Sequence, residues 1–144
     1  MLHGKIDAVL EQVGLRAEAE KKVGAYSRGM RQRLGIAEVL VKEPRVVFLD
    51  EPTVGLDPDG THRMLEMIRT LSRDRGITVF FSSHLLDQVQ RISDRVGIML
   101  RGALVAAGAI EVLGQQSLGV DQERHTLEEI YMRYFRQQPL AATA

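Results

Sequence analysis

The sequence predicts an α/β fold with a mainly parallel sheet flanked by helices. Two short apolar runs carry this prediction, VVFL at residues 46–49 and ITVFF at residues 77–81, because each is too short for a helix and suits a buried strand. Between them, Met64, Leu65, Ile68 and Leu71 recur at helical spacing, and Gly76 is expected to end that helix. The order strand, helix, strand implies a right-handed crossover, so the two strands run parallel. With 144 residues, of which 44% are apolar, one domain with a real core is expected.

Composition excludes several classes of function. Cysteine is absent, so the sequence offers no disulfide framework, thiol nucleophile or thiolate metal site. The formal net charge is zero, which gives no electrostatic footprint for DNA or RNA, and no nucleic-acid partner is expected. No apolar run approaches the roughly 20 residues of a membrane-spanning helix. We therefore expect any membrane connection to go through a partner.

The N-terminal third is expected to be helical. Residues 5–13 place apolar side chains on one helical face, and Gly14 ends that helix. Residues 16–22 are expected to form a second short helix. Ser27 is a good N-cap for a third helix, and the free N–H groups at such an end, beside Gly29, could bind a phosphate. The alternative for Ser27 is an ordinary capping serine.

Asp50 and Glu51 close the first strand, which we expect to be buried on both faces. Ionised side chains at the end of a buried strand need compensation, and a hydrated Mg²⁺ with a phosphate supplies it. The alternative is that Asp50 caps the following turn. His84 follows the second strand, and the carboxyl ends of parallel strands share one edge of the sheet, where ligands bind in open α/β folds. Asp50, Glu51 and His84 thus form one candidate site, although a lone histidine at a strand end is more often a surface residue.

The remaining elements are expected to be structural. Asp57 and Pro58 are typical of the N-cap and first turn of the helix that Gly76 ends. Residues 96–105 predict a β-hairpin, and residues 113–119 are expected to be turn-like. Thr126 and Glu129 form a capping box for a helix over residues 126–135, and residues 137–144 are expected to fray. The other histidines are expected at the surface; they are His3, His62 and His125.

Three segments resemble motifs of the ABC-type ATPases. The run VVFLDEPTVGLDP, residues 46–58, resembles the Walker B motif and D-loop of that family. The run YSRGMRQRLGIAEVL, residues 26–40, resembles the ABC signature motif and its helix, with Arg28 where glycine is usual and Met30 where glutamine is usual. The run SSHLLDQVQ, which contains His84, resembles the switch histidine segment. Together they occur in the family's order.

The resemblance implies a partial P-loop NTPase-like ABC ATPase domain. It implies a helical subdomain with the signature helix over residues 1–43, a Walker B to switch region sheet over residues 44–110, and a C-terminal helix and tail over residues 111–144. The printed residues contain no Gly-x-x-x-x-Gly-Lys-Ser/Thr phosphate loop. In the family this loop lies N-terminal to these motifs, so the expectation is the C-terminal part of a nucleotide-binding domain, inactive by itself.

The resemblance also implies roles in binding and hydrolysing ATP with Mg²⁺. Asp50 is expected to hold Mg²⁺ through water, Glu51 to orient or deprotonate the attacking water, and His84 to contact the γ-phosphate. Ser27 and Gly29 are expected to complete the site of a second ATPase subunit. Asp57 is expected to link the two sites.

The implied parent protein is the ATP-hydrolysing subunit of an ABC transporter, more like a bacterial exporter. It would form a homo- or heterodimer and lie in the cytoplasm, peripheral on the inner face of the membrane through a permease subunit. Two alternatives stay open: a non-catalytic interaction or regulatory fragment, and a DNA-associated ABC-type ATPase. Long coiled coils typical of the latter are not predicted by the sequence.

Overall fold

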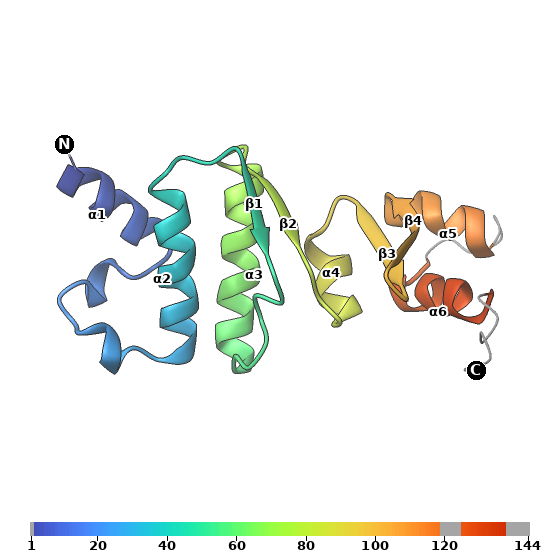
Figure 1. The fold of residues 1–144 in the computed structure, drawn as a ribbon, viewed down its shortest axis with the longest axis horizontal. Helices are drawn as coiled ribbons and strands as arrows, with labels where there is room; N and C mark the ends of the chain where they lie inside the picture. The colour runs from blue at the N-terminus through green and yellow to red at the C-terminus, as the bar shows by residue number, and fades with distance from the viewer. Residues whose placement is uncertain (1, 119–124, 138–144) are drawn as a thin grey trace. The chain divides into compact units, whose positions relative to one another are not determined.

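The computed structural model describes residues 2–118 and 125–137. The chain divides into two compact units, Met1–His84 and Leu85–Ala144. In chain order, the elements drawn in Figure 1 are α1 (Leu2–Gln12), η1 (Arg16–Glu18), η2 (Val23–Ala25), α2 (Arg28–Leu40), β1 (Val46–Leu49), α3 (Pro58–Arg73), β2 (Thr78–Phe81), α4 (Leu86–Ile92), β3 (Val96–Leu100), β4 (Ala103–Gly108), α5 (Ile110–Leu118) and α6 (Leu127–Gln137).

The first two α-helices pack against each other. Helix α1 begins three residues earlier than the predicted Lys5, and Gly14 follows its end with a φ of 63°, which fits the left-handed residue that commonly ends a helix. Arg33 of α2 donates hydrogen bonds from Nη1 to the carbonyls of Val13 and Gly14, each 2.9 Å long. A side chain of α2 thereby satisfies carbonyls that the end of α1 leaves without a helical partner.

The prediction of a second helix over residues 16–22 is wrong. Within this range the chain forms only one short 3₁₀ turn, η1, and a second, η2, follows just after it. The polar sequence of residues 16–22 offers no continuous apolar face, and so short a segment gains too little from packing to offset helix nucleation. The buried Tyr26 holds this stretch in place, because its hydroxyl donates a hydrogen bond to the carbonyl of Glu18 over 2.9 Å.

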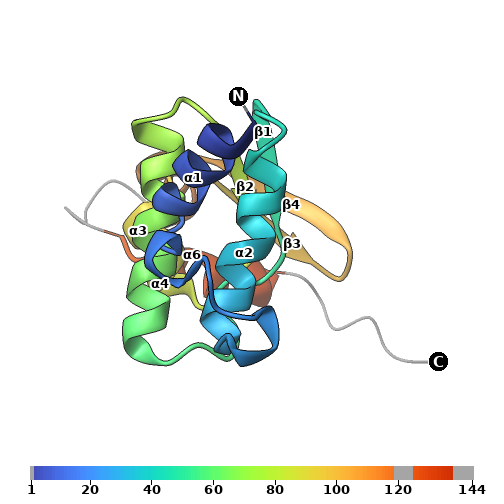
Figure 2. The same cartoon turned by 90° about the vertical axis from the view of Figure 1, so that its left-hand side faces the viewer.

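Strands β1 and β2 form a parallel pair, as predicted from the strand, helix, strand order. Their register pairs Leu49 with Phe81 at the carboxyl end. Helix α3 connects the strands and buries the predicted apolar stripe, formed by Met64, Leu65, Ile68 and Leu71. Figures 1 and 2 agree that α1, α2 and α3 lie on one side of the strand pair. The α/β arrangement is therefore confirmed.

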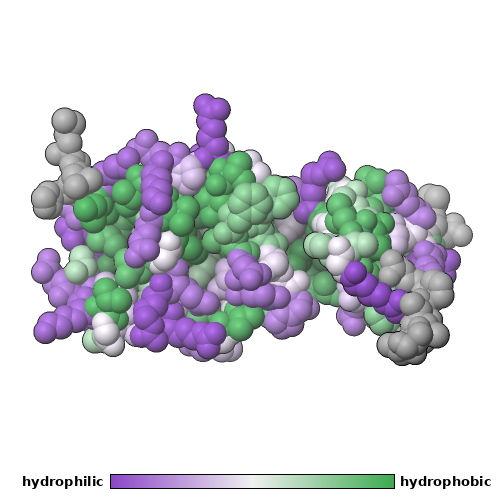
Figure 3. All heavy atoms as spheres, in the orientation of Figure 1, coloured by the Kyte–Doolittle hydropathy of each residue, from purple (hydrophilic) through white to green (hydrophobic). Residues whose placement is uncertain are grey.

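The expectation that the first strand is buried on both faces is wrong. Val47 is 2% exposed on the face toward the helices, whereas Phe48 is 77% exposed on the other face. Phe80, which pairs with Phe48 in the register, is 60% exposed, and the two rings stack with their centroids 5.4 Å apart. Hydrophobic surface is visible over β1 and β2 in Figure 3. The described helices of the first unit cover one face of this pair, which leaves the two phenylalanines exposed.

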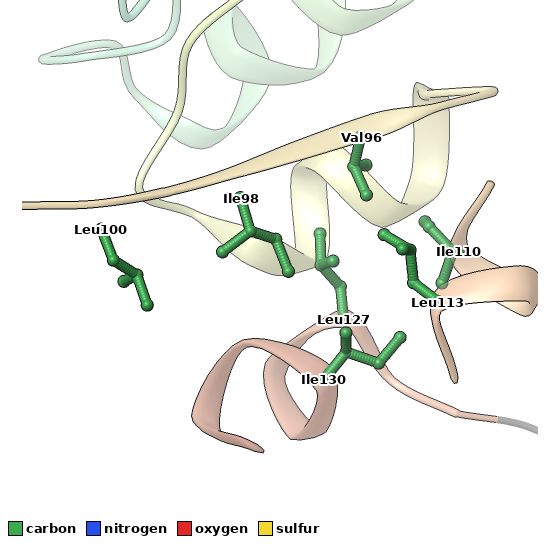
Figure 4. Packing of buried hydrophobic residues seen from close by; sticks show 7 residues of the cluster. All are labelled: Val96, Ile98, Leu100, Ile110, Leu113, Leu127 and Ile130. Carbon is green, nitrogen blue, oxygen red and sulfur yellow. The ribbon is translucent and has the colours of Figure 1, made fainter. Parts of the chain in front are cut away.

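The second unit has a core of its own. The predicted hairpin is confirmed as β3 and β4, joined through Arg101 and Gly102, which both have positive φ values, as a type I′ turn requires. Side chains from β3, α5 and α6 converge beneath it in Figure 4, and they are Val96, Ile98, Leu100, Ile110, Leu113, Leu127 and Ile130. Ile130 is fully buried in this cluster. The hairpin therefore gains its stability by packing against two helices.

The prediction of a turn at residues 113–119 is wrong for the described residues, because α5 continues to Leu118. Gly114 lowers helix propensity by about 1 kcal/mol relative to alanine, which favoured a turn in the sequence. In the structure Leu113 is buried in the core of the second unit, and this packing outweighs the local preference. Residues 138–144 of the segment expected to fray lie outside the described residues.

The capping box at the start of α6 is confirmed and predicts a pH dependence. The Thr126 amide and hydroxyl each donate to Glu129 Oε2 over 2.9 Å, and the Glu129 amide donates back to Thr126 Oγ1 over 3.2 Å. These hydrogen bonds hold the pKa of the Glu129 carboxyl below its ordinary value, the amide contributing most. A depressed folded-state pKa means that this contribution is present above the unfolded pKa and disappears as the pH falls through the folded one.

We therefore expect Glu129→Ala to lower the melting temperature at neutral pH, with the difference from wild type vanishing as the pH falls from about 5 to 3. Thermal unfolding followed by circular dichroism measures both. Glu128→Ala, at the neighbouring exposed position, serves as the control and is expected to lack this pH-dependent difference. A difference for Glu129→Ala that stays constant down to pH 3 would contradict the assignment.

Candidate functional site

The carboxyl ends of β1 and β2 bring polar side chains together. Because Leu49 and Phe81 are register partners, the residues that follow them, Asp50 and Ser82, lie side by side. The Ser82 hydroxyl donates to Asp50 Oδ1 over 2.6 Å, and the Ser82 amide donates to the carbonyl of Leu49 over 2.9 Å. The strand edge expected to carry the site therefore does carry its first carboxylate.

Glu51 turns sharply away from the strand. Its φ of 45° lies in the left-handed region, which is uncommon for a residue other than glycine. Its amide donates to the hydroxyl of Ser82 over 2.8 Å, and its carbonyl accepts from the amide of Val54 over 3.1 Å. The chain therefore bends at Glu51, just after the strand ends, and these two hydrogen bonds hold the bend.

His84 lies against the carboxylate of Glu51. Its Nδ1 is 3.1 Å from both Oε1 and Oε2 of Glu51. A carboxylate only accepts hydrogen bonds, so Nδ1 carries the hydrogen when this contact forms. The Glu51 side chain is 34% exposed and that of His84 is 66% exposed, so solvent reaches the pair and the contact adds little to stability. The pair is better suited to orienting a carboxylate than to stabilising the fold.

The start of α2 forms a second group. Ser27 is the N-cap as predicted, because its Oγ accepts from the amide of Met30 over 3.2 Å. Gly29 lies close to the following loop, since a Cβ at this position would come 3.4 Å from Leu56 Cδ2. Gln32 Nε2 also approaches the carbonyl of Val54 at 3.5 Å. The first turn of α2 therefore packs against the loop over residues 54–56.

Arg28 has a contact that the sequence did not predict. Gly55 has a φ of 73°, and a Cβ there would collide with the guanidinium group of Arg28. Glycine at position 55 thus serves both the left-handed backbone and the close approach of the arginine. Arg28, which stands where the resembled signature motif usually has glycine, therefore lies over the loop that follows Asp50 and Glu51 in the chain.

Asp57 is the N-cap of α3, as predicted. Its Oδ1 accepts from the amide of Gly60 over 3.0 Å, and Pro58 occupies the first turn. Between Glu51 and Asp57, the amide of Leu56 donates to the carbonyl of Thr53 over 3.2 Å, and Thr53 is buried. This loop is the covalent link between the carboxylates at the strand edge and the contacts at the start of α2.

The structure brings three of the six predicted site residues into one hydrogen-bonded group. Asp50, Glu51 and His84 are joined through Ser82 and through the direct contact of His84 with Glu51. Within the described residues no hydrogen bond connects Ser27 or Gly29 to that group. Sequence reasoning assigned no role to Ser82. No local sequence pattern marks Ser82, because its place beside Asp50 depends on the strand register, which sets the residue after β2 next to the residue after β1.

The other histidines differ in how they meet the expectation. His62 is exposed on α3, as expected. Both ring nitrogens of His125 are buried and, within the described residues, make no hydrogen bond, so its placement at the surface was wrong. The ring packs where a Cβ on Gly114 would collide with it. The His3 side chain lies outside the described part of the structure.

The strand edge offers a cation such as Mg²⁺ few direct protein ligands. In the described part of the chain, no group of three or more His, Asp and Glu side chains is arranged to hold a metal ion. Mg²⁺ usually keeps several waters and needs only one or two carboxylates together with substrate phosphates. Asp50 supplies one such carboxylate, and its Oδ1 is already engaged by Ser82. The site therefore fits a cation bound mainly through water and phosphate, and does not fit an all-protein cage.

None of the described helices is both long and apolar enough to cross a lipid bilayer.

Comparison with known proteins decides the family. The model of the family described as "ABC transporter" matches residues 2–54. The bacitracin transport ATP-binding protein BcrA of Bacillus licheniformis is 50% identical over 100 residues, which cover 69% of this chain and 33% of the relative. The Nod factor export ATP-binding protein I of Burkholderia lata is 39% identical over 119 residues, covering 83% of this chain and 39% of the relative.

The chain belongs to the family of ABC transporter ATP-binding proteins.

Solved structures agree with the membership and with the fold. The structure of cbiO1 from Clostridium perfringens, described as part of the ABC transporter complex cbiONQ, matches with a TM-score of 0.71 and 33% identity, covering 79% of this chain and 46% of that one. An ATP-binding cassette in its ADP conformation, MJ1267, matches with a TM-score of 0.72 and 27% identity, covering 91% of this chain and 50% of that one. The predicted ABC ATPase fold is confirmed. This ABC chain spans about a third of the length of the curated relatives quoted above.

Proposed function

We propose that this chain contributes the catalytic edge of an ATP-hydrolysing subunit of an ABC transporter. The observation that carries the proposal is the group at the carboxyl ends of β1 and β2, in which the His84 ring contacts Glu51 and the Ser82 hydroxyl links Glu51 to Asp50. Two carboxylates and an imidazole at this edge are suited to positioning a water against a phosphate. The family membership supports ATP as the substrate.

Glu51 is the residue proposed to act on the attacking water. Its carboxylate can accept a hydrogen bond, and then the proton, from a water beside it. His84 Nδ1 lies 3.1 Å from both carboxylate oxygens, which limits the rotation of the Glu51 side chain. With Nδ1 turned to Glu51, Nε2 is the ring atom proposed to approach the γ-phosphate. The two side chains thus hold the water and the phosphate at one edge of the sheet.

Asp50 is proposed to hold Mg²⁺ through a water molecule. Bound Mg²⁺ would neutralise phosphate charge during hydrolysis. The protein's own contribution is the fixed direction of the Asp50 carboxylate, because its Oδ1 is held by the hydroxyl of Ser82 at 2.6 Å. ATP and Mg²⁺ are therefore the proposed ligands.

Ser27, Gly29 and Asp57 are proposed to act at the boundary with a second ATPase subunit. Ser27 presents the N-terminal end of α2, where free N–H groups and the helix dipole favour an anion. Gly29 lies half-buried beside Leu56, so this end is packed against the loop that leads to Asp57. A phosphate bound at the start of α2 could therefore affect the carboxylates through this loop, and a ligand at the carboxylates could affect the start of α2. This contact is the proposed link between the two sites.

A membrane permease is the proposed partner for transport, and the cytoplasmic face of the membrane is the proposed location. The names of the relatives support this class: one is a bacitracin transport protein, another a Nod factor export protein, and cbiO1 is described as part of a transporter complex. We also propose that the chain divides into a helical part over residues 1–43, a sheet over residues 44–110 and a C-terminal part over residues 111–144.

We expect the 144-residue chain by itself to bind MgATP with a dissociation constant of about 1 mM or weaker, without useful turnover. The printed sequence contains no phosphate loop, and that loop normally supplies the backbone cradle and the lysine that carry ground-state binding. Isothermal titration calorimetry with MgATP, with MgAMP as the control for weak adenosine binding, measures this affinity. Micromolar binding of MgATP would contradict the prediction.

A second candidate function is a non-catalytic interaction module. One observation favours it: Phe48 and Phe80 form an exposed, stacked aromatic pair on the uncovered face of β1 and β2. Exposed apolar surface of this kind often marks a protein contact. Phosphate release by the native protein, expressed from its own gene with its natural upstream region, decides between the two. MgATP hydrolysis supports the ATPase, and its absence from the native protein supports the module.

A further inference from the structure

The hydroxyl of Ser82 makes two hydrogen bonds of opposite direction at the strand edge. It donates to Asp50 Oδ1 over 2.6 Å and accepts from the amide of Glu51 over 2.8 Å. A hydroxyl has one hydrogen and two lone pairs, so a single side chain can do both. An alanine could do neither. Ser82 thus connects the carboxylate of one proposed site residue with the backbone of the next.

The position of Ser82 follows from the parallel register. Leu49 pairs with Phe81, and the Ser82 amide donates to the carbonyl of Leu49 over 2.9 Å. This last ladder contact places the Ser82 side chain beside Asp50, 32 residues away in the chain. The hydroxyl is therefore held by the sheet itself, which is more rigid than a loop.

Glu51 needs such support. Its φ of 45° is unfavourable for a residue with a side chain, and such residues persist where the surroundings over-determine the backbone. Its carbonyl is bound by the amide of Val54 at 3.1 Å, and its amide is bound by Ser82. The second of these bonds ties the Glu51 backbone to β2, the strand that leads to His84. The direction in which the carboxylate leaves the chain is thereby set relative to the imidazole.

We propose that Ser82 is a positioning residue for the hydrolysis proposed above: it holds the Glu51 backbone in its left-handed conformation and fixes the Asp50 carboxylate through Oδ1. The inference rests on the proposed function for its effect on rate. Its structural half, the bond from the Glu51 amide, is independent of that function. Ser82 touches neither the water nor the phosphate in this proposal and acts through its two neighbours.

The first test follows the Glu51 amide in the 144-residue chain by NMR hydrogen exchange. In Ser82→Ala the Glu51 amide is expected to exchange about tenfold faster, the effect of one lost hydrogen bond. Ser82→Thr keeps the hydroxyl and should restore slow exchange, whereas Ser82→Val has nearly the shape of threonine without the hydroxyl and should not. Thr70→Ala, which removes an exposed hydroxyl on α3, is the control. Unchanged exchange in Ser82→Ala would overturn the proposal.

The second test uses the native protein and steady-state ATP hydrolysis. Ser82→Ala and Ser82→Val are expected to lower kcat about tenfold, with Ser82→Thr within about twofold of wild type. The threonine rescue distinguishes a role of the hydroxyl from a general loss of stability. Full kcat in both Ser82→Ala and Ser82→Val would overturn the positioning role. If wild type hydrolyses no ATP while the Glu51 amide still responds, the proposed function fails and the hydrogen-bond half of the inference is supported.

Discussion

In the native protein, Glu51→Gln is expected to lower the rate of ATP hydrolysis by at least about 100-fold while ATP binding is retained. Glutamine keeps the size of the side chain and one acceptor oxygen, but it cannot take a proton from the attacking water. In the structure both carboxylate oxygens of Glu51 lie 3.1 Å from His84 Nδ1. The substitution therefore removes the negative charge that lies against the imidazole ring. Phosphate release measures hydrolysis, and equilibrium binding of a fluorescent ATP analogue measures affinity.

The control for Glu51→Gln is Glu66→Gln, which removes the same charge from the exposed face of α3. Glu66 Oε1 lies 3.8 Å from Arg69 Nη1 in a surface ion pair, and the loss of this pair is expected to have little effect on stability. Near wild-type hydrolysis is therefore expected for this variant. Normal turnover in Glu51→Gln would remove Glu51 from its proposed role, and loss of ATP binding would point to a structural role instead.

The second large effect is expected for His84→Ala, which should lower ATP hydrolysis by about 100-fold. The substitution removes the ring that contacts Glu51 and the nitrogen proposed to approach the γ-phosphate. His84 is 66% exposed, so its loss leaves no buried cavity and should change the melting temperature little. Steady-state hydrolysis and thermal unfolding together separate the two effects. His62→Ala, at another exposed histidine, is the control and should hydrolyse ATP normally.

A double variant tests whether the two residues act as a unit. Groups that act together in one step have strongly non-additive effects on rate. Glu51→Gln combined with His84→Ala is therefore expected to be about as slow as the slower single variant. Effects that multiply in full would mean that the histidine acts independently of the carboxylate, and the contact at 3.1 Å would then have no part in the mechanism.

Much of the candidate site could be predicted from the sequence because its parts repeat familiar local patterns. Ser27 and Asp57 cap their helices through amides three residues further on, so these contacts depend only on nearby residues. The apolar runs before Asp50 and His84 identified two parallel strands, and parallel strands end at one edge. The shared edge followed from chain order alone.

Other features could not be predicted because they depend on which surfaces meet. The turn expected at residues 113–119 is helical up to Leu118, since Leu113 packs into the core with β3 and α6. The polar segment over residues 16–22 has no such partner and forms only short turns. Strand β1 was expected to be buried on both faces, whereas Phe48 is 77% exposed. Apolar composition indicates which residues tend to be buried, but it does not indicate which face of a strand other elements pack against.

The sequence by itself determined the strands, the caps and the edge that carries Asp50, Glu51 and His84, because these depend on periodicity and on contacts within one turn. Only the tertiary structure decided how the edge is built. The bond from Ser82 to Asp50 spans 32 residues, and that from the Glu51 amide to Ser82 spans 31. Contacts so distant in the chain exist only once the register of β1 against β2 is set, and this register is a property of the packed sheet.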